Sequence, residues 1–210
     1  MADSAAAAGG SASIRLLVAS SNAGKLREYR ELARGSALEL DLLPNFRELI
    51  PFEETAPTFA EIAVGKALYY GRFTDEMLIA EDSGLVVPAL GGAPGVYSAR
   101  YAGPNGTDAE CVQKLLREMQ GKTGSDRRAR FVCVTALAQK GRALAVVSDF
   151  VDGLIAEEPR GTHGFGYDPV FLLPEFGRTS AEISPDEKNR ISHRAKAFRK
   201  IQDVLTSPSF

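Results

Sequence analysis

The chain has 210 residues, of which 44% are hydrophobic and 25% charged, so it is long enough to bury a sizeable core. Its formal net charge of −2 leaves no basic field to hold duplex nucleic acid, and we expect no stable nucleic-acid binding. Two cysteines without metal-ligand or redox spacing indicate a reduced, cytoplasmic protein, and no apolar run is long enough to span a membrane.

The first thirteen residues, MADSAAAAGGSAS, have no early Lys or Arg and only four consecutive alanines. A signal peptide needs a charged start and a longer apolar run, so we expect a disordered tail over 1–13 and one domain over 14–210. Ile14–Ala19 is a short apolar run typical of a buried strand. A polar turn follows, and from Lys25 to Ala33 the apolar residues recur at helical spacing. Strand, turn and helix are the opening of an α/β protein.

An acidic loop over 44–57 precedes the next two elements. Thr58 and Glu61 form a capping-box pattern, which predicts a helix through about residue 70. The apolar residues 77–80 predict a second short buried strand. That strand is expected to end just before Asp82, which places Asp82 where a strand passes into a loop, the usual location of site residues in α/β folds.

The second half of the chain continues the mixture of helices and strands. We predict a helix over 107–119 capped by Thr107 or Asp108, and two long strands over 129–138 and 143–151 joined by a tight turn at Lys140-Gly141. A glycine-rich loop over 162–169, a short strand at 171–173, and helices that begin at Pro185 and after Ser192 complete the chain. The fold class is therefore α/β with a mixed sheet.

The first polar turn has the composition of a phosphate-binding loop. Small residues let the backbone approach an anion, a helix N-terminus favours negative charge, and Lys25 adds a positive charge. It is not a Walker A motif, because Leu26 replaces the Ser or Thr that would bind Mg²⁺. A capped turn with an exposed lysine explains the same residues. The candidate phosphate ligands are Ser20, Ser21, Asn22, Ala23, Gly24 and Lys25.

Two carboxylates and a lysine on separate segments suggest a magnesium site. Glu54 and Asp82 would reach a cleft from different loops, and Mg²⁺ prefers one or two carboxylates completed by phosphate oxygens and water. Lys66 lies between them in the sequence, and Asp82 could bind metal or activate water. Alternatively, Glu53 and Glu54 are solvated loop charges and Asp82 caps a turn.

The loop GTHGFGYDP, residues 161–169, carries three glycines that permit close backbone approach. Phe165 stands between two of them, so its ring could be offered to a flat ligand. An Ω-loop with Phe165 in the core is an equal alternative.

His193 and Arg194 are adjacent donors at the start of the last helix. They could donate to the 6-oxo group of a purine, whereas the 6-amino group of adenine would meet donor against donor. A basic helix start on the surface explains the same pair.

These segments, in this order and spacing, resemble the inosine triphosphate pyrophosphatase family, the Ham1-like dITP/XTP pyrophosphatases, over about residues 14–201. The most specific stretches are EDSGL at 81–85, LGGAPGVYSARYAG at 90–103, GFGYDP at 164–169 and SHR at 192–194. The resemblance implies a Mg²⁺-dependent hydrolase that cleaves ITP, dITP and XTP to the monophosphate and pyrophosphate, cleansing the nucleotide pool. It also implies an elongated mixed sheet flanked by helices, two lobes around a central cleft, and a homodimer.

Residue roles follow from the same motifs. The resemblance implies that Asp82 is the metal ligand and proton acceptor, that Glu54 lies near the metal, and that Lys66 contacts phosphate. Phe165 would stack on the base. The remaining substrate ligands implied are the loop Ser20 to Lys25, then Ser83, Gly166, Tyr167, Asp168, Lys188, His193 and Arg194.

The chain departs from the family pattern at three positions. Ser21 and His163 stand where relatives often have glycine, and Ile62 stands where they often have asparagine. None of these removes a residue assigned to catalysis. Two rival interpretations are a Maf-like pyrophosphatase for modified pyrimidine nucleotides and a non-enzymatic nucleotide-binding module. The pair His193-Arg194 favours a purine, and the intact Asp82, Glu54, Lys25 and Lys66 favour an enzyme.

Overall fold

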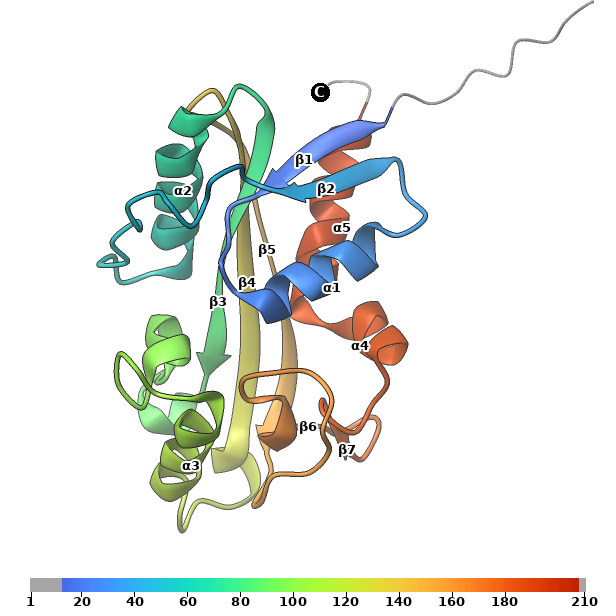
Figure 1. The fold of residues 1–210 in the computed structure, drawn as a ribbon. Helices are drawn as coiled ribbons and strands as arrows, with labels where there is room; N and C mark the ends of the chain where they lie inside the picture. Colours follow the sequence, from blue (N-terminus) through green and yellow to red (C-terminus); the bar gives the residue numbers. More distant parts are fainter. Residues whose placement is uncertain (1–12, 208–210) are drawn as a thin grey trace, which may run out of the picture.

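A seven-stranded mixed sheet organises residues 13–207, the part of the chain that the computed structural model describes (Figure 1). The strand order is β2-β1-β3-β4-β5-β6-β7; β1 runs parallel to β2 and β3, and the other neighbours are antiparallel. The strands are β1 (Ile14–Val18), β2 (Leu38–Leu42), β3 (Met77–Val86), β4 (Arg128–Gln139), β5 (Arg142–Ile155), β6 (Phe171–Leu173) and β7 (Arg178–Thr179). The α/β class with a mixed sheet is confirmed. The expected tail falls, apart from Ser13, on residues 1–12, which lie outside the described residues.

In the described part of the chain, five α-helices follow polar residues whose side chains accept a hydrogen bond from a backbone N–H of the first turn. They are α1 (Ala23–Ala33), α2 (Phe59–Tyr70), α3 (Asp108–Glu118), α4 (Pro185–Ile191) and α5 (His193–Thr206), capped by Asn22, Thr58, Thr107, Ser184 and Ser192 respectively. The predicted helices are confirmed, as are the predicted caps Thr58 and Ser192, and Thr107 rather than Asp108 caps α3. The predicted capping box of α2 is incomplete in one respect. The Glu61 carboxylate accepts from the Thr58 hydroxyl, whereas a capping box has it accept from the Thr58 backbone N–H. No helix among residues 13–207 is long and apolar enough to cross a bilayer.

Helices cover both faces of the sheet, and strand alternation decides which residue meets which helix (Figure 1). Leu17, Leu78 and Ala80 point towards α2 and form one core with it. Ile79 is on the opposite face, in a second core with Tyr29 of α1 and Phe198, Ile201 and Leu205 of α5. The same alternation continues along β3, so consecutive residues of that strand face different helices.

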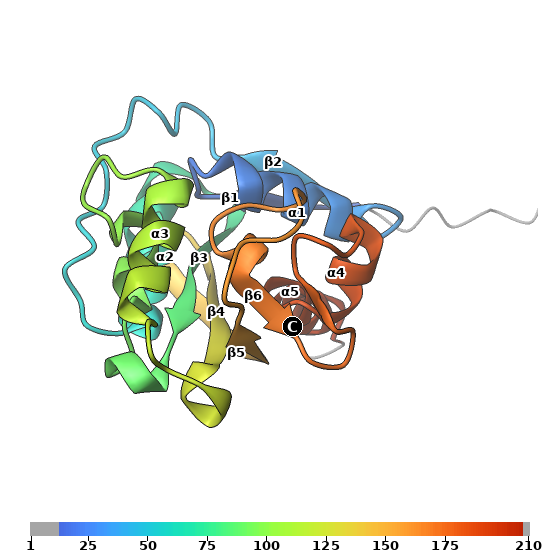
Figure 2. The same cartoon turned by 90° about the horizontal axis from the view of Figure 1, so that it is seen from below.

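A third core lies at the far end of β3 and β4. It joins Cys111, Val112 and Leu115 of α3 to Leu85, Phe131, Tyr167 and Phe171. Seen from below, α3 and α4 lie on opposite sides of β6 (Figure 2). Cys111 and Cys133 are both buried and unpaired, in agreement with the sequence. The division into two lobes stays a prediction.

The sequence interpretation was wrong about the end of β3. The strand does not stop at Ala80 but continues to Val86, so Asp82 lies in its middle. The reason is the pairing with β4, whose register runs unbroken through Asp82–Val134 and Gly84–Val132. On its other side, β3 loses its strand partner beyond Ile79, because the pairing with β1 ends there. The sequence interpretation missed two strands. Strand β2 is the edge partner of β1, and β7 has only two residues.

Candidate active site

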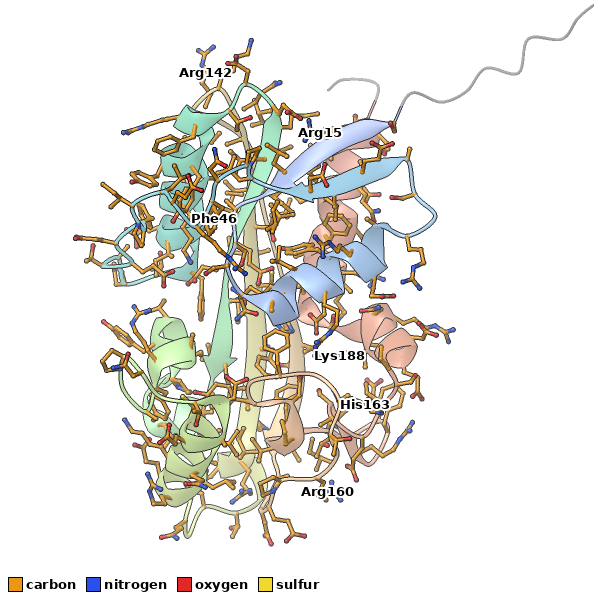
Figure 3. All side chains as sticks on the ribbon, viewed as in Figure 1. Arg15, Phe46, Arg142, Arg160, His163 and Lys188 are labelled. Carbon is orange, nitrogen blue, oxygen red and sulfur yellow. The ribbon has the colours of Figure 1, made fainter. Side chains whose placement is uncertain are left out.

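A cavity of about 720 Å³ opens where β1 ends and β3 continues without it. The structure brings nearly every predicted site residue to its wall; Ala23 and Gly24 are the exceptions. Glu54 lines the cavity and Glu53 does not, so Glu54 is the carboxylate that faces the site. His163, labelled in Figure 3, lies outside the lining. The predicted residues in the wall are Ser20, Ser21, Asn22, Lys25, Glu54, Lys66, Asp82, Ser83, Phe165, Gly166, Tyr167, Asp168, Lys188, His193 and Arg194.

The turn between β1 and α1 is held by its own polar side chains. Asn22 Oδ1 accepts from the Lys25 N–H at 3.0 Å, and Ser20 Oγ accepts from the Asn22 N–H at 3.2 Å. These bonds fix the helix N-terminus whose dipole favours an anion. Lys25 reaches into the cavity and pairs with Glu81, with 3.1 Å between Nζ and Oε1. The turn is therefore both a cap and a cationic wall.

Glu54, Lys66 and Asp82 form a compact ionic cluster. Lys66 Nζ, on α2, lies 2.5 Å from Glu54 Oε1 and 3.2 Å from Asp82 Oδ1. Burial alone would lower the pKa of Lys66, but the two carboxylates raise it. Burial and Glu54 raise the pKa of Asp82 against the opposing effect of Lys66 and Lys25. The cluster therefore holds one lysine between two carboxylates.

The chemistry of this cluster fits a hard divalent cation. Asp82 Oδ2 is buried and has no hydrogen-bond partner among the described residues. An unpaired buried carboxylate oxygen is costly unless something else occupies it. Residues 13–207 contain no group of three His, Cys, Asp or Glu placed to hold a metal. Asp82 and Glu54 are the two carboxylates that share Lys66, and as a pair they could hold such a cation. Mg²⁺ is commonly bound by one or two carboxylates together with water and substrate phosphates.

A buried ionic network, which the sequence interpretation missed, lies on the other face of β3. Arg194 is 2% exposed; its Nε and Nη2 donate to Glu81, and its Nη1 donates to Glu28. Lys188 Nζ donates to Glu28 at 2.8 Å and to Asp168 at 2.5 Å, and Figure 3 shows it between α1 and α4. Burial would raise the pKa of Glu28, but Arg194 and Lys188 together lower it to about 2. Three carboxylates and two cations thus join α1, β3, the 161–169 loop, α4 and α5.

The positions of Glu28 and Glu81 in the sequence could have indicated that they belong to the site. Glu28 follows Lys25 by three residues, so both lie on the same face of α1. Glu81 neighbours Asp82, and once the strand is extended the two side chains must point to opposite faces. Asp82 meets Lys66 of α2, whereas Glu81 meets Tyr29 of α1 at 2.5 Å and Arg194 of α5.

The glycine-rich loop presents Phe165 to the cavity as a half-buried ring. Asp168 Oδ2 accepts from the Phe165 N–H at 2.9 Å, and Asp108 Oδ2 accepts from the Gly166 N–H at 2.7 Å. Tyr167 is 4% exposed, and its hydroxyl donates to the Ser98 carbonyl at 2.8 Å. Asp168 and Tyr167 therefore anchor the loop, and Phe165 is its aromatic surface.

His193 and Arg194 start α5 as predicted, but neither is a surface residue. His193 stacks on Phe131, with ring centroids 4.8 Å apart and planes 8° from parallel. Burial, with Arg194 adding to it, lowers the pKa of His193 to about 3, so the imidazole is neutral at physiological pH. Its Nδ1 is buried without a partner among the described residues. Arg194 has five N–H donors, and the contacts with Glu28, Glu81 and Ser83 engage four of them.

Comparison with known proteins places this cavity in context. The sequence profile of the Ham1 family matches residues 16–204. A dITP/XTP pyrophosphatase of Geobacillus kaustophilus is 52% identical over 90% of this chain and 92% of its own length. One of Bacillus subtilis is 42% identical over 90% of this chain and 96% of its own length.

Two solved structures share the fold. The HAM1 protein from Coxiella burnetii superposes with a TM-score of 0.81 at 43% identity, covering 92% of this chain and 98% of that one. The Ham1 protein from Staphylococcus aureus gives a TM-score of 0.80 at 37% identity, covering 91% and 97%.

Proposed function

The chain belongs to the Ham1 family, and on this premise we propose that it hydrolyses non-standard purine nucleoside triphosphates, namely dITP, ITP and XTP. The products proposed are the nucleoside monophosphate and pyrophosphate; the relatives are named dITP/XTP pyrophosphatases. One observation carries the proposal: a single cavity brings together a cationic turn at a helix N-terminus, a carboxylate with an unpaired oxygen, and an aromatic ring beside buried donors.

Asp82 and Glu54 would hold a Mg²⁺ ion in this proposal. The ion would neutralise phosphate charge and acidify a bound water. Support comes from the unpaired Oδ2 of Asp82 and from Glu54, which shares Lys66 with Asp82, because a cation that keeps water and phosphate ligands needs only one or two carboxylates.

In the proposed reaction a water oxygen attacks the α-phosphorus while the bond to the bridging oxygen between the α- and β-phosphorus breaks. Asp82 accepts the proton of the attacking water, and pyrophosphate leaves with its charge offset by Lys25 and Lys66. Lys66 is paired with Glu54 and Asp82, so it would be free to turn to phosphate if a Mg²⁺ held by these two carboxylates supplied the positive charge in its place. No covalent enzyme intermediate is required.

Base recognition is assigned to Phe165, His193 and Arg194. Phe165 would stack on the purine ring, because its loop holds it at the cavity wall. The remaining N–H of Arg194 and the unpaired Nδ1 of His193, when that atom carries the proton, would donate to the 6-oxo group. An adenine amino group would leave these buried donors unpaired, which is a strong ground for discrimination.

The test is an assay of the purified protein with Mg²⁺ and a panel of ITP, dITP, XTP, GTP, ATP and dTTP. We expect pyrophosphate and the matching monophosphate from the first three, and much less from ATP and dTTP. Preference for a pyrimidine nucleotide would favour the Maf-like alternative. Nucleotide binding without turnover would favour a binding module. A homodimer and a cytoplasmic location remain predictions; sedimentation of the protein would test the first.

A further inference from the structure

Arg100 donates two hydrogen bonds to Glu54. Its Nη1 donates to Glu54 Oε2 at 3.0 Å, and its Nη2 donates to the Glu54 backbone carbonyl at 3.2 Å. Arg100 is the last residue of the 3₁₀ helix Gly95–Arg100, which in Figure 1 lies in green between α2 and α3. That helix is itself fixed to β3, since Ser98 Oγ accepts from the Leu85 N–H at 2.9 Å.

The loop that carries Glu54 is attached to a different part of the molecule. The Phe52 N–H donates to the Tyr70 hydroxyl at 3.0 Å, and the Tyr69 hydroxyl donates to the Ile50 carbonyl at 3.0 Å, so α2 holds the loop. Phe46, labelled in Figure 3, packs into the same core as α2. Arg100 therefore adds a second attachment, from the β3 side, directly at Glu54.

The two oxygens of Glu54 have different cations. Oε1 faces Lys66, which it shares with Asp82, and Oε2 faces Arg100, which bonds no other carboxylate among the contacts of residues 13–207. Lys66 is thus shared between Glu54 and Asp82, whereas Glu54 is the only carboxylate that Arg100 contacts among the described residues. When Lys66 turns to phosphate, the Arg100 contacts remain to keep the Glu54 side chain directed at Asp82.

We propose that Arg100 is a positioning residue for the divalent-cation site: it holds Glu54 facing Asp82 and thereby sets the affinity for the cation. This rests on the metal role given to Glu54 and Asp82 in the proposed function. Arginine suits the task because its planar fork meets a carboxylate and a carbonyl at once, whereas a lysine offers one point charge. Residues that orient metal ligands typically account for a 10- to 100-fold effect on metal affinity.

The test measures cation binding without nucleotide. Mn²⁺ is titrated into the protein and free Mn²⁺ is followed by electron paramagnetic resonance, for the wild type, Arg100→Ala, Arg100→Lys and Glu54→Gln. We expect Arg100→Ala to bind Mn²⁺ at least about tenfold more weakly and Arg100→Lys to fall between it and the wild type. Arg117→Ala is the matched control, because Arg117 is an exposed arginine on α3 outside the cavity lining. Thermal unfolding of each variant verifies that it is folded.

The double variant shows whether Arg100 acts through Glu54. In the Glu54→Gln background, adding Arg100→Ala should weaken Mn²⁺ binding no further. An equal further loss there would overturn the proposal, as would wild-type affinity in Arg100→Ala. In the pyrophosphate assay, raised Mg²⁺ should restore turnover to Arg100→Ala but not to Asp82→Asn. If the wild type binds Mn²⁺ through these residues yet cleaves no nucleotide of the panel, the proposed function fails and the Arg100 inference stands.

Discussion

The two carboxylate oxygens of Asp82 have different surroundings: one is paired with a lysine and the other has no partner among the described residues. Oδ1 is 3.2 Å from Lys66 Nζ, and Oδ2 is buried and unpaired among the described residues. Burial, the largest effect, raises the pKa of Asp82, and the opposing effect of Lys66 reduces that rise without cancelling it. Such a carboxylate can accept a proton from water once charge compensation is complete.

Replacing Asp82 by Asn keeps the shape of the side chain and removes its charge and basicity. We expect kcat for ITP to fall by about 10²–10⁴ while the melting temperature changes little, since the buried strand is unaltered. An assay of pyrophosphate release measures the fall in kcat, and a thermal melt measures the melting temperature. Near-normal turnover of ITP by Asp82→Asn would refute the role given to Asp82.

Arg194, to which we assign a role in base recognition, also has a structural role. It is 2% exposed and paired with Glu81 and Glu28, so truncation leaves two buried carboxylates short of a cation. We expect Arg194→Ala to lose about 3–5 kcal/mol of unfolding free energy in addition to preference for ITP over ATP. Chemical denaturation gives the first quantity and the ratio of kcat/KM values gives the second.

Phe165→Ala is the comparison for Arg194→Ala, because Phe165 is half-buried on a loop. It should raise KM for ITP with a smaller loss of stability. If both variants lost stability equally, the structural role of Arg194 would need revision.

At the scale of elements, α1 and the glycine-rich loop meet at Gly24. A Cβ built on Gly24 would lie 2.6 Å from a ring carbon of Phe165, closer than packed atoms approach. Gly24 has no positive φ, so the reason for glycine is the space beside the helix and not the backbone conformation. The helix N-terminus and the aromatic surface are thereby held in direct contact.

Gly24→Ala should push Phe165 out of position and raise KM for ITP several-fold. Helix α1 itself should not suffer, because alanine favours a helix over glycine by about 1 kcal/mol. Steady-state kinetics and a thermal melt separate the two effects. In the Phe165→Leu background, where the side chain is smaller, Gly24→Ala should raise KM no further than Phe165→Leu alone. An unchanged KM in the Gly24→Ala single variant would show that the ring shifts freely.

At the scale of the whole molecule, the network around Glu28 joins segments that are far apart in the sequence. Glu28 of α1 contacts Lys188 of α4 and Arg194 of α5, which follow it by 160 and 166 residues. The cleft wall therefore depends on the docking of the C-terminal helices against the first βα unit. Charges buried in this way are destabilising when one partner is lost.

This network predicts a pH dependence of stability. The pKa of Glu28 falls from 4.5 to about 2 in the folded protein, so its contribution is present above about pH 4.5 and is lost as the pH falls towards 2. Glu28→Gln should therefore be clearly less stable than the wild type at pH 7, and the difference should shrink below pH 4.5. Denaturation at several pH values measures it; a constant difference down to pH 2 would contradict the assigned pKa.

The sequence determined the local structure. Capping residues such as Thr58, Thr107 and Ser192, apolar periodicity and turn residues predicted the α/β class and most elements, because these signals act between residues that are close in the chain. The order of four motifs also predicted which residues meet in the cleft.

Only the tertiary structure decided how the site residues share their charges. Pairing with β4 extended β3 through Asp82 and so sent Asp82 towards α2 and Glu81 towards α1 and α5. Arg100 and Glu28 acquired their roles from partners 46 and up to 166 residues away. No pattern in the neighbouring sequence identifies such partners. A buried charge needs an opposite charge beside it, and the fold decides which residue supplies that charge.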